Sequence, residues 1–225
     1  MQMIFGADSK VPATTKLING YDLYSWTARI NYFPAFWGRN ISGENAITKE
    51  EIEFLRSKNC KIALIFDDLT EKNVACMNGE EDALRAINAA KALGVEDYGN
   101  VAIFAKIGDS WGINNSWMHF WAFYLHENGY TPGFMANTDS SQNFNFGRQC
   151  SHFVENTLDK ENYGTIYWAT EPKVRALKPE TWAPYCPSAL RPEKIDVWQV
   201  GSTWCGDIHS KKSFLRDKSV MKYMW

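Results

Sequence analysis

Ile62-Ala63-Leu64-Ile65-Phe66 is an uninterrupted apolar run that ends at the acidic pair Asp67-Asp68. A second run of this kind is Val101-Ala102-Ile103-Phe104-Ala105, and a segment with helical periodicity lies between the two. A strand that is covered on both faces is apolar at consecutive positions, because neither face meets water. The two runs therefore predict parallel strands inside an α/β domain.

Helical segments with start and stop signals separate these runs. Thr48 followed by Glu51 is typical of a capping box, and Gly94 and Gly129 are glycines suited to ending a helix in the left-handed conformation. The expected helices run from Thr48 to Asn59, from Glu80 to Leu93, and from a cap at Ser116 to Asn128.

Strands and helices thus alternate along the chain, which predicts repeated βαβ units in one domain spanning residues 1–225. Such a sheet either closes into a barrel or stays open and doubly wound. Seven strands are expected: Met3–Ser9, Pro34–Ile41, Lys61–Asp67, Val101–Ile107, Thr131–Asn137, Thr165–Thr170 and Ile195–Gly201.

Composition excludes several classes of protein. The net charge of -2 gives no electrostatic basis for binding nucleic acid or an anionic membrane. No apolar run approaches the ~20 residues that span a bilayer, and Met1–Gly6 does not predict a signal peptide. The sequence leaves the oligomeric state open.

Cofactor and metal motifs are also missing from the sequence. It contains neither a phosphate-binding glycine loop nor a Gly-x-Ser-x-Gly motif, and the four histidines lack zinc-ligand spacing. We therefore expect no cofactor and no metal. The five cysteines are expected to be free thiols, with a Cys186–Cys205 disulfide as the alternative in an oxidising compartment.

Polar side chains follow most of the expected strands. Parallel strands bind ligands beyond their carboxyl ends, so these side chains are the candidate site. Aromatic rings are abundant, and Trp37, Trp168 and Trp198 are candidate platforms for a sugar or for another flat ligand. The candidates at the strand ends are Asp8, Arg39, Asp67, Asp68, Asp109, Asn137, Glu171 and Gln199.

Several segments resemble a known family. Phe5-Gly6-Ala7-Asp8-Ser9 resembles the Gly-x-Asp-x-Ser first strand of the family 25 glycoside hydrolases, the lysozyme-like muramidases, and of their glycoside-hydrolase-like bacterial relatives. Pro34–Arg39, Thr48–Ile52 and Val197–Val200 with the later Asp207 are similar to the second group. The resemblance implies a TIM-type (β/α) barrel whose mouth binds a polysaccharide such as peptidoglycan.

The resemblance also implies which residues line the cleft, and here the sequence departs from the family. The first-strand aspartate falls on Asp8 and the late acidic residue on Asp207. The Asp-x-Glu pair of the hydrolases falls on Lys106 and Gly108, so that only the adjacent Asp109 is acidic.

Two functions follow from this departure. The first is a glycoside hydrolase with Asp109 as the acid and Asp8, Asp67 and Asp207 as supporting carboxylates. The second is a barrel that binds cell-wall glycan without cleaving it. Each carboxylate also has a purely structural alternative, in which it holds a loop or a turn.

Overall fold

Strands β1 to β7 run parallel around a closed barrel, and β8 lies antiparallel between β7 and β1. The computed structural model describes residues 3–96, 100–157, 163–171 and 179–225. The sheet is therefore an irregular (β/α) barrel of the TIM type. Its strands are β1 Ile4–Asp8, β2 Phe36–Asn40, β3 Lys61–Phe66, β4 Ala102–Lys106, β5 Thr131–Ala136, β6 Ile166–Thr170, β7 Val197–Cys205 and β8 Ile208–Leu215.

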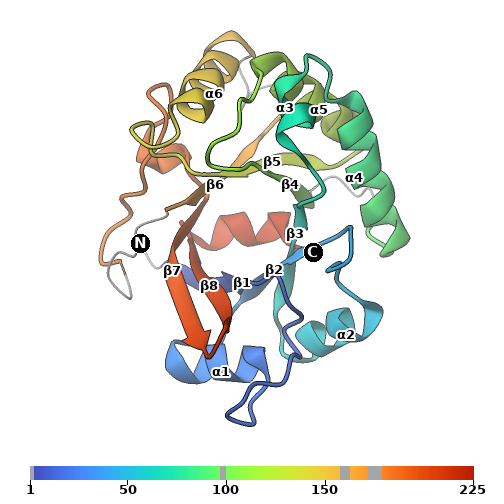
Figure 1. The fold of residues 1–225 in the computed structure, drawn as a ribbon, viewed down its shortest axis with the longest axis vertical. Coiled ribbons are helices and arrows are strands. Elements are labelled where there is room, and N and C mark those ends of the chain that lie inside the picture. The colour runs from blue at the N-terminus through green and yellow to red at the C-terminus, as the bar shows by residue number, and fades with distance from the viewer. Residues whose placement is uncertain (1–2, 97–99, 158–162, 172–178) are drawn as a thin grey trace.

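Helices surround the barrel on two sides. Figure 1 shows α1 and α2 below the barrel, and α3, α5 and α6 above it with α4 along one flank. The helices are α1 Leu23–Ile30, α2 Lys49–Ser57, α3 Glu71–Ala75, α4 Glu80–Ala92, α5 Asn115–Glu127 and α6 Phe144–Thr157, with the short 3-10 helices η1 Pro192–Lys194 and η2 Lys218–Tyr223. Within the described ranges, no helix is both long enough and apolar enough to cross a bilayer.

The seven expected strands are all present, and the eighth is the main addition. Strand β8 contains Ile208-His209-Ser210-Lys211-Lys212-Ser213-Phe214-Leu215, which is too polar to resemble a buried strand. It follows β7 through a tight turn at Gly206, whose φ is 59°. It then pairs with β1 from Ile4 to Asp8 and so closes the barrel.

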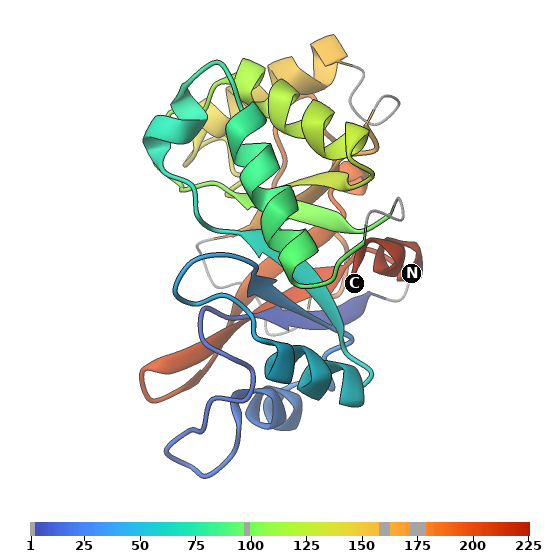
Figure 2. The same cartoon turned by 90° about the vertical axis from the view of Figure 1, so that its right-hand side faces the viewer.

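Alternation along each strand divides the core into two parts. Residues that point inward pack in the barrel, where Trp168 lies edge-on to Phe36 and Phe104, with ring centroids 6.0 Å and 5.2 Å away. Residues that point outward form the larger core under the helices. Val220 of η2 packs on the inner cluster. Figure 2 shows η2 in dark red beside the C-terminus, on the right.

One expected capping residue and one expected capping-box interaction differ in the structure. Asn114, not Ser116, caps α5, because its side-chain oxygen accepts from the backbone N–H of Ser116. Thr48 caps α2 as expected, but Glu51 does not complete the box. Its carboxylate lies in the interior and accepts from the Ala13 N–H, 2.7 Å away.

Candidate functional site

The candidate site is a cleft at the carboxyl ends of the strands. One cavity of about 420 Å³ and a neighbouring one of about 290 Å³ share Asp109, Thr170, Gln199 and Lys211, so together they form a single cleft. The remaining lining residues are Ser9, Lys10, Lys106, Ile107, Gly108, Met135, His209 and Asp8 in the larger cavity, and Glu171, Gly201 and Ser202 in the smaller one.

Asp8 is the most buried carboxylate in the larger cavity. It ends β1 and points inward, and only 8% of the residue is exposed. The side-chain amide of Gln199 donates to its Oδ1 at 2.8 Å, and the Ser213 hydroxyl lies 3.5 Å from the same atom. Burial raises the pKa of Asp8 to about 6, although Lys106, Gln199 and Lys211 each act in the opposite direction.

Gly38 explains how Asp8 comes to be so enclosed. A Cβ at this position would lie 2.7 Å from the Cβ of Asp8 and 2.9 Å from Cη2 of Trp168. The missing side chain therefore lets the indole approach Asp8 from below. Asp8 and the buried indole of Trp168 thus both lie close to the backbone of Gly38.

Asp109 is the second carboxylate of the cleft and lies in the loop after β4. It lines both cavities. Partial burial raises its pKa, and the nearby Lys211 acts in the opposite direction. The structure thus brings Asp8, at the end of β1, and Asp109, in the loop after β4, into one cleft, while the catalytic roles predicted for them stay a prediction.

Lys106 occupies the end of β4, where the resemblance placed the first carboxylate of the Asp-x-Glu pair. Its Nζ lies 2.7 Å from Oδ2 of Asp67, and both side chains are partly exposed. The Asn40 amide approaches the same oxygen at 3.5 Å. Asp67, which was predicted as a supporting carboxylate, is thus engaged by an ammonium group and is not among the lining residues of either cavity.

Basic side chains line much of the cleft, and of these the sequence indicated only Lys106. Lys10, Lys106 and Lys211 line the larger cavity together with His209. Burial, Lys211 and Lys10 lower the pKa of His209, which favours the neutral form of its imidazole. Lys211 and His209 belong to β8, and they were missed because that strand was not predicted.

Four residues that were predicted to contact a ligand are buried, so the sequence prediction is wrong for them. Trp37, Arg39 and Trp168 have no exposed surface, and Trp198 is 2% exposed. Trp37, Arg39 and Trp198 alternate with the inward-pointing residues, so they point outward from the barrel toward the surrounding layer. Trp168 points inward but lies in the inner core.

Arg39 stabilises the structure through an ion pair and hydrogen bonds and is not exposed to a ligand. Its Nε lies 2.9 Å from Oε1 of Glu51, and its Nη1 donates to the carbonyls of Ser9 and Lys10 at 2.9 Å and 2.8 Å. Nη2 donates to the Asn45 carbonyl at 3.1 Å. This network fixes the backbone of the loop after β1, which carries two residues of the cleft.

Three other predicted residues lie outside the cleft. Asp68 forms an exposed ion pair with Arg85 at 2.7 Å, because strand alternation turns it away from Asp67. Asn137 is buried and accepts from the Asp139 N–H, which shapes the loop after β5. Asp207 is exposed at the turn between β7 and β8, beyond the strand ends.

Glu171 and Gln199 were predicted from their positions at strand ends, and both line the cleft. Glu171 is 6% exposed, and its Oε1 accepts from the Tyr185 N–H at 3.1 Å. No group of three His, Cys, Asp or Glu side chains within the described ranges is arranged to hold a metal ion.

The Lys106 ammonium is expected to influence the titration of Asp8. Of the groups that lower the pKa of Asp8, Lys106 has the largest influence. Lys106→Met is therefore expected to raise the pKa of Asp8 above about 6. NMR titration of the ¹³C-labelled Asp carboxyl groups measures this value. Lys49→Met on the exposed surface of α2 is the control, and an unchanged pKa in Lys106→Met contradicts the assigned geometry.

Comparison with known proteins finds the fold of this barrel in several solved structures. No family model matches the chain, and no curated protein matches it by sequence. An uncharacterised protein of B. stearothermophilus superposes with a TM-score of 0.78 at 23% identity, covering 99% of this chain and 100% of the other.

Two further solved structures carry informative names. GHIP, a glycosyl hydrolase 25 of Streptococcus pneumoniae, has a TM-score of 0.55 at 14% identity, covering 99% of this chain and 92% of that one. A muramidase from Acremonium alcalophilum has a TM-score of 0.55 at 13% identity, with 97% of each chain covered. The chain therefore has the lysozyme-like barrel fold of the glycosyl hydrolase 25 proteins, as the resemblance implied.

Proposed function

We propose that this barrel binds a cell-wall polysaccharide of the peptidoglycan type in its cleft without cleaving it by the usual pair of carboxylates. The observation that carries this proposal is the ion pair between Lys106 and Asp67 at the end of β4. An ammonium group stands where a hydrolase of this fold would carry a carboxylate. The names of two structural neighbours, a glycosyl hydrolase 25 and a muramidase, support a polysaccharide as the ligand.

The chemistry of glycoside hydrolysis explains why Lys106 argues against cleavage. Cleavage requires one carboxylic acid to protonate the leaving oxygen and, as a rule, a second carboxylate about 5 to 9.5 Å away. At the end of β4 the chain has an ammonium group in place of such a carboxylate, and this ammonium is paired with Asp67 at 2.7 Å.

The cleft is nevertheless well suited to binding. Its lining combines hydrogen-bonding groups from Gln199, Ser202 and Thr170 with the ammonium groups of Lys10 and Lys211. Hydroxyl groups of a sugar pair with the first set. Carboxylate groups carried by cell-wall glycan pair with the lysines.

A second candidate function is hydrolysis with a single acid. Burial raises the pKa of both Asp8 and Asp109, and both face the cleft. Some glycosidases use the substrate's own acetamido group in place of a carboxylate nucleophile, so that one protonated acid is sufficient. Asp109 is the candidate acid in this alternative.

Sedimentation with purified peptidoglycan tests the binding proposal, and the turbidity of the same suspension tests hydrolysis. We expect the wild type to sediment without clearing the suspension, and Lys211→Ala to weaken binding about tenfold, because it removes a charged partner from both cavities. Lys49→Ala, on exposed α2, is the matched control.

The remaining outcomes separate the two functions. Clearing that is lost in both Asp109→Asn and Asp8→Asn supports the hydrolase and overturns the binding-only proposal. If the wild type neither binds nor clears, both functions are wrong.

A further inference from the structure

The hairpin formed by β7 and β8 extends the cleft beyond the barrel. Strand β7 has nine residues and β8 has eight, whereas β1 and β2 have five each. Figure 2 shows the hairpin in orange and red, reaching the left edge of the molecule on the side away from η2. One face of this hairpin therefore continues the wall of the cleft outward.

Strand register identifies the residues on that face. Ser202 pairs with Lys211, and both line the cleft. Side chains two residues apart on a strand point to the same side. Trp204 and His209, which pair with each other two residues further out, therefore share the face of Ser202 and Lys211. His209 lines the larger cavity, which agrees with this assignment.

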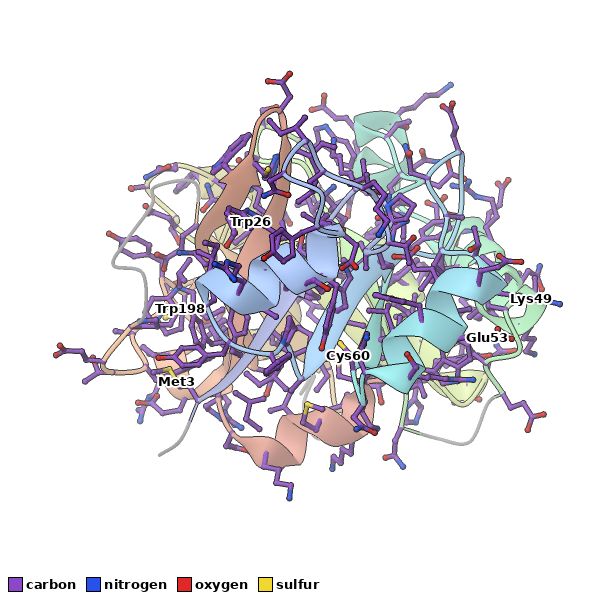
Figure 3. The ribbon with its side chains drawn as sticks, turned by 90° about the horizontal axis from the view of Figure 1, so that it is seen from below. Met3, Trp26, Lys49, Glu53, Cys60 and Trp198 are labelled. Atoms are coloured by element: carbon purple, nitrogen blue, oxygen red, sulfur yellow. The ribbon has the colours of Figure 1, made fainter. Side chains whose placement is uncertain are left out.

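The opposite face of the hairpin packs against α1. The Ser210 hydroxyl lies 2.7 Å from that of Thr27, and the Thr203 hydroxyl accepts from the Asn31 amide at 2.8 Å. Trp26 of α1 also donates from Nε1 to the carbonyl of Trp204 at 3.0 Å. Figure 3 labels Trp26 beside the hairpin. The hairpin is thus held in a fixed position from behind.

Trp204 is an exposed ring in this fixed position. It is 57% exposed, whereas Trp37 and Trp168 are fully buried. Its ring lies against the imidazole of His209, with centroids 4.1 Å apart and planes inclined at 31°. A large ring that is oriented in advance but remains open to solvent loses little conformational entropy when it binds a ligand.

We propose that Trp204, supported by His209, is an additional sugar-binding subsite at the outer end of the cleft. The occupant is one sugar ring of the glycan, whose apolar C–H face stacks on the indole. This inference rests on the proposed function, because the same glycan continues inward to Lys211 and Asp8.

The length of the hairpin supports a ligand of several sugars. Ser213, Lys211 and His209 alternate along the cleft-facing side of β8, and Ser213 lies beside Asp8. Four residues of a strand span about 13 Å, which is longer than a single sugar ring. A disaccharide held near Asp8 therefore does not need the outer subsite, whereas a longer chain does.

Binding of glycan fragments of defined length tests the subsite. An amidase removes the peptides from purified peptidoglycan, and partial digestion of the freed glycan strands with a muramidase gives fragments that are separated into disaccharides and hexasaccharides. Calorimetry then gives the Kd of each. We expect Trp204→Ala to weaken hexasaccharide binding about tenfold and disaccharide binding less than about twofold. Trp204→Phe keeps an aromatic face and is expected to restore most of the affinity.

Phe33→Ala is the matched control, because Phe33 is 80% exposed and precedes β2 at the opposite end of the barrel. The melting temperature of Trp204→Ala shows whether the hairpin remains folded. If the wild type binds the hexasaccharide and Trp204→Ala binds it equally well, the subsite is wrong while the proposed function stands. If the wild type binds no fragment, both proposals are wrong.

Discussion

Replacing Glu51 by glutamine is expected to lower the free energy of unfolding by about 3–5 kcal/mol. Glu51 is 1% exposed, and its carboxylate is 2.9 Å from Nε of Arg39, which has no exposed surface. The substitution retains the shape of the side chain but removes its charge, so it leaves the guanidinium buried without a counterion. Urea denaturation followed by circular dichroism measures the loss.

Glu53→Gln is the matched control, because Glu53 is on the same helix but exposed, as Figure 3 shows on α2. It is expected to change the free energy of unfolding by less than about 0.5 kcal/mol. Equal effects of the two substitutions would show that the buried ion pair does not stabilise the fold. The loss of Glu51 is also expected to disturb the cleft, because Arg39 fixes the carbonyls of Ser9 and Lys10.

Asp8→Asn is expected to stabilise the protein at pH 8 by about 1–3 kcal/mol. Burial raises the pKa of Asp8 from 3.8 to about 6, and each unit of pKa corresponds to about 1.4 kcal/mol. The folded state therefore binds this proton more tightly than the unfolded state does. Ionisation of Asp8 reduces the free energy of unfolding as the pH rises from about 4 to about 6, and the reduction persists above that range.

Thermal unfolding of wild type and Asp8→Asn between pH 3 and pH 8 tests this expectation. The two proteins should differ most at pH 8 and converge near pH 3, where the carboxyl group is protonated in both the folded and the unfolded state. Asp207→Asn, at the exposed turn of the hairpin, is the control and should follow the wild type at every pH. A difference that grows as the pH falls would contradict the raised pKa. A stability gain at pH 8 would mean that Asp8 is kept at a cost to stability, as is common for functional groups.

The parallel strands were predictable because strands that are buried on both faces are apolar at consecutive positions of the sequence. Ile62–Phe66 and Val101–Ala105 are apolar on both faces, and the structure places Ile62–Phe66 in β3 and Ala102–Ala105 in β4. Strand β8 was not predictable in this way. Its inward side carries Lys211 and His209 at the open mouth, so its pattern is that of a surface segment.

The candidate site was predictable in its position but only partly in its residues. Asp8, Asp109, Glu171 and Gln199 follow the rule that ligands bind beyond the carboxyl ends of parallel strands. The predictions for Trp37 and Trp198 are wrong because size and polarity do not tell which face of a strand a residue occupies, whereas Trp168 points inward but is buried in the inner core. Asp8 points into the barrel and pairs with Gly38 of β2, so Gly38 also faces inward. Trp37 and Arg39 flank Gly38, and alternation along the strand therefore assigns them to the outer face.

The pairing of β1 with β8 has a consequence for synthesis of the protein. The strand that carries Asp8 leaves the ribosome long before its partner strand β8, which ends at Leu215. Until then, one edge of β1 has no neighbour, and unpaired strand edges are prone to join other chains. Nascent chains halted before β8 should therefore aggregate or bind chaperones, and chains that include β8 should do neither.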